Sequence, residues 1–192
     1  MKSSAAVFRA LRERIVALSE YRIRLQRTSS DMERASKQAI FALQRDDLAR
    51  AEILLREAKS HEVAAEKLTT KEPMLAREGM WHAAREEYAE ARFCERAVRG
   101  DVIVTKEDLK EDPDILLGAL SDLIGENVRR AIAAATRGEV KTVDRIYEQS
   151  VIIVDFLTSL DLTGGLRSKG DQARGHLRRL EDIRYDLSRR VV

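Results

Sequence analysis

Apolar residues recur every three or four positions along most of the chain, which is the spacing of one face of an α-helix. The first such stretch runs from Val7 to Leu43 and predicts a helix that ends near residue 44, with a weak point at residues 28–30. Asp46-Asp47 then precedes a second helical stretch, which we expect to break near Thr69.

Proline and glycine mark the ends of the next elements. Pro73 is expected in the first turn of a third helix, where its missing N–H costs nothing. That helix should run to about Val98, with Gly100 as its left-handed C-terminal residue. Asp112-Pro113 has the form of a cap and first position, so it predicts a fourth long helix that Gly138 ends.

The remaining segments are shorter. Residues 102–104 read as a short extended piece, and Thr105-x-x-Asp108 resembles a capping box for a brief helix. A fifth helix is expected over residues 141–160, and Gly164-Gly165 should separate it from a last helix over about 168–190. No segment has a clear strand pattern. We therefore predict an all-α fold, a bundle of about six or seven helices, in a single domain spanning residues 1–192.

Composition agrees with long helices that carry solvated charged faces, because 35% of the residues are charged and Gly and Pro together number only 11. The single cysteine, Cys94, allows no internal disulfide and indicates a reducing compartment. No apolar run approaches the length of a membrane span and no signal peptide is visible, so we expect a cytoplasmic protein without a membrane partner.

Charge is unevenly distributed along the chain. Residues 1–27 carry seven Lys or Arg against two acids, and residues 166–192 carry eight against four. Residues 101–126 instead carry eight acids against two Lys. Basic ends around an acidic middle indicate an anionic partner near the termini and a cation near the middle. The ordinary alternative, solvated helix faces, explains the same pattern.

Two carboxylate pairs have the spacing of a site. Glu87 and Glu90 are three residues apart on the expected third helix, and Asp122 and Glu126 are four apart on the fourth, so each pair shares one helix face. Glu87 falls on the apolar side of its helix, where an unpaired carboxylate is costly. If the two helices pack through these faces, four carboxylates meet. Such oxygen ligands suit Mg²⁺ or Mn²⁺, which could activate water against a phosphodiester.

Other chemistry has less support. The carboxylates could instead form surface ion pairs with nearby arginines, namely Arg85, Arg92, Arg129 and Arg130. The three histidines lie on different expected helices, no Glu-x-x-His is present, and no Walker-type glycine loop occurs. We interpret Cys94 and Trp81 as core residues.

Several motifs resemble the translin/TRAX family, in which TRAX is the translin-associated factor. Residues 87–91 (Glu-Tyr-Ala-Glu-Ala) resemble the Glu-Tyr-x-Glu-Ala motif of TRAX, and residues 122–126 (Asp-Leu-Ile-Gly-Glu), preceded by Leu-Leu-Gly at 116–118, resemble its Asp-Leu-x-Gly-Glu segment. Residues 104–107 resemble a turn of translin, and residues 181–190 resemble translin's C-terminal ending. One departure is that the spacing from Leu-Leu-Gly to Asp122 is one residue longer here.

The resemblance implies a seven-helix fold, assembly into an octameric barrel, and a Mg²⁺- or Mn²⁺-dependent endoribonuclease that acts on short RNA enclosed in that barrel. It implies that Glu87, Glu90, Asp122 and Glu126 are both the metal ligands and the catalytic residues, on the TRAX side of the family. A second, translin-type subunit is left open, as is the choice between single-stranded and duplex RNA or DNA.

Few aromatic residues are available for base stacking, so we expect phosphate contacts and strong salt dependence. The candidate phosphate-binding residues are Arg9, Arg12, Arg22, Arg24, Arg27, Arg85, Arg92, Arg96, Lys169, Arg174, Arg178 and Arg179. Two other functions stay open: a translin-like nucleic-acid-binding protein without catalysis, and a helical adaptor that binds no nucleic acid.

Overall fold

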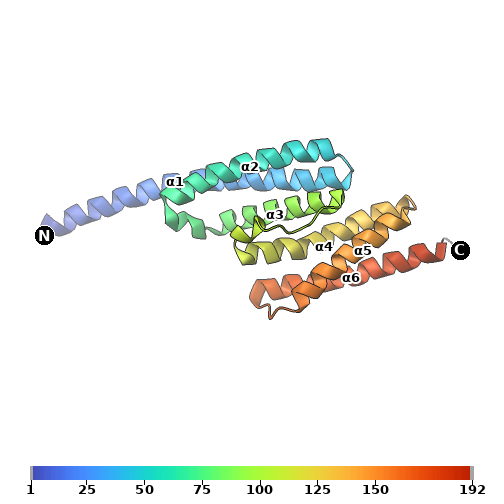
Figure 1. The fold of residues 1–192 in the computed structure, drawn as a ribbon. Helices are drawn as coiled ribbons and strands as arrows, with labels where there is room; N and C mark the ends of the chain where they lie inside the picture. The colour runs from blue at the N-terminus through green and yellow to red at the C-terminus, as the bar shows by residue number, and fades with distance from the viewer. Residues whose placement is uncertain (1, 191–192) are drawn as a thin grey trace.

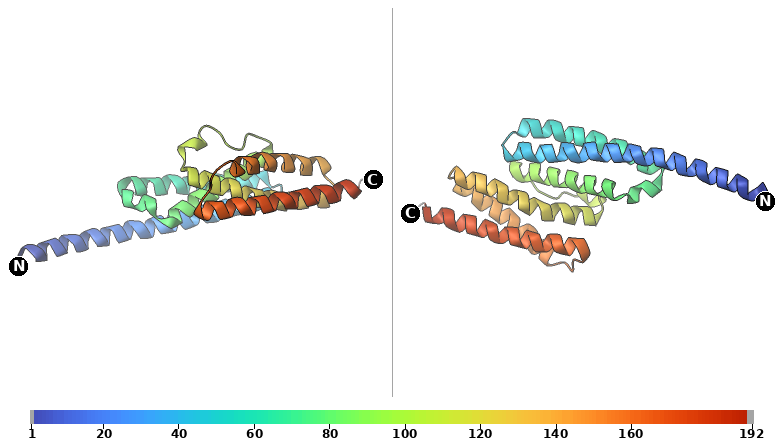
Figure 2. Two further views of the ribbon diagram at one scale, coloured as in Figure 1. Left: turned by 90° about the horizontal axis from the view of Figure 1, so that it is seen from below. Right: turned by 180° about the vertical axis from the view of Figure 1, so that it is seen from behind.

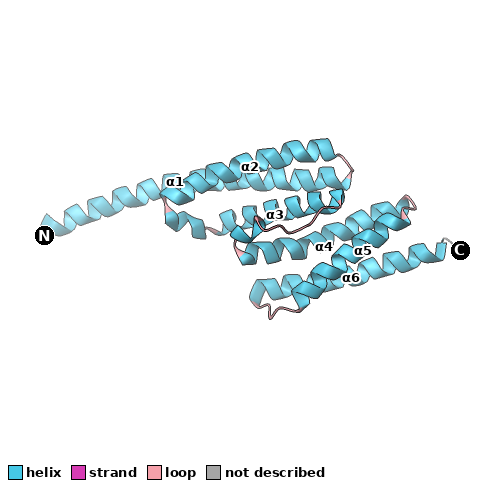
Figure 3. Cartoon of the chain, viewed as in Figure 1, coloured by secondary structure: helices cyan, strands magenta, loops and turns pink. Residues whose placement is uncertain are grey.

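The computed structural model describes residues 2–190, which form a layered bundle of six α-helices (Figure 1). The helices are α1 (Lys2–Gln44), α2 (Leu48–Lys71), α3 (Gly79–Arg99), α4 (Pro113–Thr136), α5 (Val140–Thr158) and α6 (Gly164–Arg190). Two short 3₁₀ turns, η1 (Pro73–Arg77) and η2 (Asp108–Lys110), lie in the connections. Within residues 2–190 no strand occurs (Figure 3), so the all-α prediction is confirmed.

Several predicted boundaries are confirmed by cap geometry. Gly100 and Gly138 both have positive φ, at 80° and 74°, and follow the ends of α3 and α4. The Asp112 side chain accepts a hydrogen bond from the Asp114 N–H at 3.0 Å and so caps α4. The Asp108 side chain accepts a hydrogen bond from the Thr105 N–H at 2.7 Å, which is the bond that the last residue of a capping box makes back to the first. The element that follows is a 3₁₀ turn and not an α-helix.

Other expectations about helix ends are wrong. Pro73 starts η1 instead of the third helix, because the extended backbone at Glu78 (φ −69°, ψ 126°) separates η1 from α3. Residues 28–30 do not weaken α1, since Ser29 lies in the packed interior at 1% exposure and tertiary packing overrides its low helix propensity. The last helix begins at Gly164, earlier than expected, and residues 102–104 form an irregular loop.

The helices form a flat stack in which each packs on its neighbours in turn. α1 packs on α2 and α3, α3 packs on α4, and α4 packs on both α5 and α6. Figures 1 and 2 show α2 and α6 on opposite outer sides of this stack, with α3 and α4 between them. The N-terminal part of α1 extends beyond all the other helices in every view.

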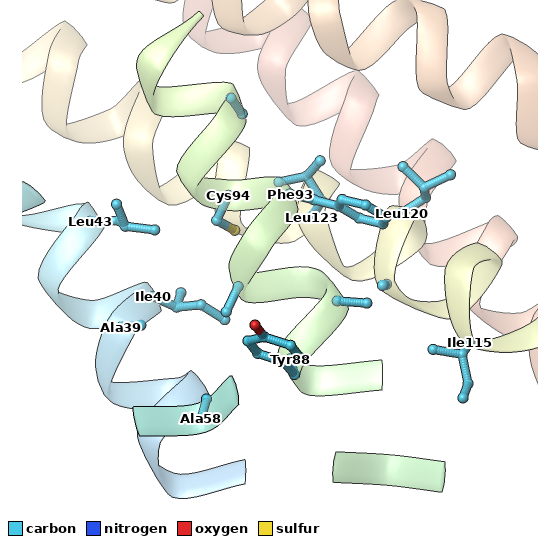
Figure 4. Close-up of a cluster of buried hydrophobic side chains, with 14 of the residues drawn as sticks. Ala39, Ile40, Leu43, Ala58, Tyr88, Phe93, Cys94, Ile115, Leu120 and Leu123 are labelled. Carbon is cyan, nitrogen blue, oxygen red and sulfur yellow. The ribbon is translucent and has the colours of Figure 1, made fainter. Parts of the chain in front are cut away.

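The main core runs through the stack and is rich in alanine, and a small second cluster is formed by Ala134, Val143 and Leu187. Figure 4 shows Ile40 and Leu43 of α1 facing Tyr88 and Cys94 of α3, with Leu123 of α4 beyond them. Cys94 is 1% exposed and Trp81 is 3% exposed, as expected of core residues. Small buried side chains such as alanine allow neighbouring helices to pack closely, and α3 packs on α4 in this core.

A buried polar contact also joins α4 to α5. Asn127, fully buried, donates through Nδ2 to the Ser150 hydroxyl at 3.0 Å, and Ser150 donates in turn to the Ile146 carbonyl. A buried amide without a partner would be costly, so this contact sets the register of α5 against α4. Over the described residues, no helix is both long and apolar enough to span a bilayer.

Candidate active site

The four carboxylates singled out by their spacing all line one cavity of about 380 Å³. Glu87 and Glu90 reach it from α3, and Asp122 and Glu126 reach it from α4. Helices α1 and α6 supply further parts of its wall, namely Lys37, Ile40, Phe41, Gln172 and His176, and α4 adds Ser121, Gly125 and Arg129. Packing of the third and fourth helices thus places the four acids along one cavity, while their role as a metal site stays a prediction.

Burial makes the charged forms of the two α3 glutamates costly. Glu90 is 7% exposed, and burial followed by repulsion from Glu87, Asp122 and Glu126 raises its pKa to about 9. Burial likewise raises the pKa of Glu87 to about 7, although the nearby Lys37 ammonium opposes the shift. Two acids that bind protons near neutral pH in one cavity form a site that a cation would stabilise.

Basic and amide side chains form ion pairs and hydrogen bonds with the cavity acids. Lys169 of α6 donates to both Asp122 and Glu86, which ties α6 to α3 and α4. Glu126 pairs with Arg129 at 3.1 Å and accepts from the Gln44 amide of α1. The Lys37 Nζ lies 3.9 Å from Glu87 Oε2. The alternative interpretation is that nearby arginines form ion pairs with these acids. Of the four arginines named for it, only Arg129 pairs with a cavity acid, within the described residues.

The donor set fits a hard divalent cation in type. All four groups are carboxylates, which Mg²⁺ and Mn²⁺ prefer over nitrogen or sulfur ligands. Among the described residues, however, no three His, Cys, Asp or Glu side chains stand close enough together to surround one ion. Binding a metal therefore requires Asp122 and Glu126 to turn away from Lys169, Gln44 and Arg129.

Helices far apart in the sequence supply the residues that the sequence analysis missed. Gly125 of α4 faces α6, where a Cβ at Gly125 would stand 3.4 Å from His176 Nε2. The backbone of Gly125 thus lies directly against the His176 ring, and both residues line the cavity. Lys37, Gln172 and His176 carry no local motif, so only the packing of α1 and α6 could have assigned them to the cavity.

Three of the candidate phosphate-binding arginines are placed elsewhere. Arg92 and Arg96 both pair with Asp108, at 3.0 Å and 2.5 Å, and Arg85 donates to Glu111. None of the three lines the carboxylate cavity. The expectation that they lie beside the acids is wrong, because helix α3 presents them to the loop before α4, where they anchor η2.

The other basic candidates lie on α1 and α6. Lys169 lies among the acids as described, and Arg22 and Arg174 pair with Glu78 and Asp171. The rest are exposed and form no ion pair within the described residues, namely Arg9, Arg12, Arg24, Arg27, Arg178 and Arg179. They remain candidates for contacts with phosphate.

Solved structures of similar shape are known. One is apo-NeC3PO, which superposes with a TM-score of 0.85 over 94% of this chain and 96% of that chain at 21% identity. Another is AfC3PO in complex with duplex RNA, with a TM-score of 0.85, the same coverage and 24% identity. The chain has the C3PO fold. A further crystal structure of AfC3PO agrees, with a TM-score of 0.84 and 24% identity.

The C3PO fold is the translin-type fold, so the recognition made from the motifs of α3 and α4 is confirmed at the level of the fold. The described chain has six α-helices where the resemblance implied seven. No protein-family model and no curated protein matches the sequence. At this level of identity the C3PO structures establish the architecture of the chain, and the chemistry rests on its own cavity.

Proposed function

We propose that this chain is a subunit of a metal-dependent endoribonuclease that cuts RNA at the carboxylate cavity. The observation that carries the proposal is the convergence of Glu87, Glu90, Asp122 and Glu126 on one cavity of about 380 Å³. The RNA in the AfC3PO complex supports the choice of substrate, because that protein shares the fold.

The residues divide the work by position. Glu87, Glu90, Asp122 and Glu126 would hold Mg²⁺ or Mn²⁺, which supplies charge neutralisation and a more acidic water when bound. Water would attack phosphorus as the bond to the 3′ oxygen breaks, and the departing 3′ oxygen takes a proton from solvent, so the products carry a 5′-phosphate and a 3′-hydroxyl. Glu90 or Glu126, in its ionised form, would take the proton of the attacking water. A basic surface outside the cavity binds the flanking phosphates.

Substitution of one α4 acid tests the assignment. Asp122→Asn should reduce cleavage of a labelled short RNA duplex by at least about 100-fold in Mg²⁺, while the affinity for the duplex stays within about threefold. Glu57→Gln, an exposed acid on α2, is the matched control and should cleave normally. Wild-type cleavage rates in Asp122→Asn would exclude this cavity as the nuclease site.

EDTA separates the enzyme from the two alternatives. Cleavage that stops in EDTA and returns with Mn²⁺ supports the nuclease. Tight duplex binding without cleavage in either condition would instead support a non-catalytic nucleic-acid-binding protein. No binding at low salt would support the adaptor.

We also propose that the chain assembles into a closed homo-oligomer around its RNA, an octamer being the form that the family resemblance implies. Mass measurement in solution, with and without a translin-type partner, tests this part separately from cleavage. A chain that stays monomeric at all concentrations would contradict it.

A further inference from the structure

Exposed apolar side chains concentrate at two places on the surface. The first is the N-terminal overhang, which we define as residues 4–17 of α1, all of them exposed. The second is a groove of about 790 Å³ between the loop after α3 and helices α4 and α5. Exposed patches of this kind on a folded chain indicate surfaces that another molecule covers.

The overhang has one apolar stripe. Val7, Phe8, Leu11 and Ile15 are 52–68% exposed, and their spacing keeps them within about 100° of one another around the helix. The same face continues into the bundle, where Leu25 and Met32 are fully buried. The stripe is therefore the core-facing side of α1, prolonged for about 20 Å beyond the helices that cover it.

The groove has the complementary character. Its floor is formed by buried or half-buried residues of α4, including Leu116, Leu117 and Leu120. Its walls are more open: Leu109 is 69% exposed and Ile152 is 70% exposed. A groove of this size and lining accepts the apolar face of a helix, as in helix-in-groove recognition.

Charge favours the same pairing. Arg12, which flanks the stripe, forms no ion pair within the described residues. The acidic segment 101–114 borders the groove; of its two acids in the lining, Glu111 is paired with Arg85, whereas Asp101 forms no ion pair within the described part of the chain. Arg12 beside the stripe would thus meet Asp101 beside the groove. Figures 1 and 2 show the overhang pointing away from its own bundle, so it cannot reach the groove of its own chain.

We propose that the overhang of one chain docks in the groove of a second copy, with Phe8 and Leu11 inserted toward Leu109 and Ile152. The contact is head-to-tail, so each chain offers one overhang and one groove, and the interface repeats until a ring closes. This interface would build the assembly proposed above, but its test measures mass and cross-links and does not depend on cleavage.

Complementation between two variants tests the contact. Phe8→Glu/Leu11→Glu disables the overhang, and Leu109→Glu/Ile152→Glu disables the groove; all four side chains are exposed, so the fold should be kept. Each variant alone should lose at least about tenfold in self-association measured by sedimentation. An equimolar mixture should regain one interface and add a species of twice 21.8 kDa. Ile53→Glu, an exposed apolar residue on α2, is the matched control and should assemble as the wild type does.

Cross-linking keeps the test decisive if other contacts also join the chains. A Phe8→Cys chain mixed with an Ile152→Cys chain should form a mixed disulfide dimer, and neither should do so alone; Cys94 is buried and does not compete. A Phe8→Cys chain that cross-links to itself would overturn the head-to-tail contact. So would a wild-type chain that stays monomeric, or variants that assemble normally without a mixed cross-link.

Discussion

Glu90 carries the largest cost of charge burial among the cavity acids. Its pKa of about 9 in the folded chain stands above its ordinary value of 4.5, because of burial and then repulsion by Glu87 and Asp122. The folded chain therefore holds a proton that the unfolded chain has released. It follows that the free energy of unfolding decreases as pH rises from about 4.5 to about 9.

Glu90→Gln should remove this dependence. At pH 8 without metal, we expect the variant to be more stable than the wild type by about 2–5 kcal/mol, since each pKa unit corresponds to about 1.4 kcal/mol. At pH 5 the two proteins should differ by less than about 1 kcal/mol. Urea unfolding in EDTA at both pH values measures this, with Glu57→Gln as control. An equal gain at both pH values would show that the Glu90 carboxylate is not the cause.

Lys169 and a metal ion would compete for Asp122. Burial lowers the pKa of Lys169, but the hydrogen bonds that its ammonium donates to Asp122 and Glu86 outweigh burial, raise the pKa and keep the side chain charged. Lys169→Met removes this rival cation, so Mn²⁺ should bind about 3- to 10-fold more tightly, as titration calorimetry at pH 7.5 would show. Lys141→Met, an exposed lysine on α5, should leave the affinity unchanged. Unaltered affinity in Lys169→Met would place the ion away from Asp122.

Helical spacing explains why the acids could be predicted at the scale of single residues. Glu87 and Glu90 share a face, as do Asp122 and Glu126, and both faces belong to helices with strong end signals. His176 could not be assigned in the same way, since its place depends on how α6 docks against Gly125. The periodicity of a single helix does not predict contacts of this kind between distant helices.

At the scale of elements, η2 and its loop depend on one buried carboxylate. The Asp108 side chain has 0% exposure and binds Arg92 and Arg96 together with the N–H and hydroxyl of Thr105. Its burial opposes ionisation, but these partners prevail and lower its pKa to about 2. The stability that it contributes is present above its ordinary pKa of 3.8 and is lost as pH falls toward 2.

Asp108→Asn should therefore destabilise the chain at pH 7 by about 3 kcal/mol, because two arginines lose their partner in a buried setting. Near pH 2.5 the difference from the wild type should shrink. Thermal unfolding at both pH values gives the comparison, with the exposed Asp155→Asn as control. A loss below about 0.5 kcal/mol at pH 7 would mean that the loop is held by its apolar contacts alone.

Helix ends could be predicted from the sequence where a capping side chain or a glycine marks them locally. Features that depend on how distant segments pack could not. Gly100 and Asp112 mark helix ends through their own backbone and side-chain geometry, so these ends were predictable. The role of Arg96 was not, because Asp108 reaches it across a loop whose path follows no periodic pattern. The course of α1 beyond its neighbours is also invisible in its sequence, since the apolar stripe is the same in the covered and uncovered parts.

At the scale of the whole molecule, the exposed basic residues of α6 lie on the element that also lines the cavity. Arg178 and Arg179 are exposed and form no ion pair within the described residues; Arg179 shares the helix face of Gln172 and His176, and Arg178 is its neighbour on the outer face. RNA that reaches the carboxylates should therefore place neighbouring phosphates along α6. Contacts of this kind release counterions, so each one contributes to the salt dependence of binding.

Arg178→Glu/Arg179→Glu should weaken duplex RNA binding at least about tenfold at 100 mM salt and reduce the slope of log K against log salt by about 2. Arg56→Glu/Lys67→Glu makes the same change of charge on exposed positions of α2, on the opposite outer side of the bundle (Figure 1). If charge acted only through the net field of the chain, both variants would weaken binding equally. Fluorescence anisotropy over several salt concentrations measures both affinity and slope. A weaker affinity and a smaller slope in the α6 variant alone would place the RNA along α6. Equal slopes in the two variants would contradict that placement.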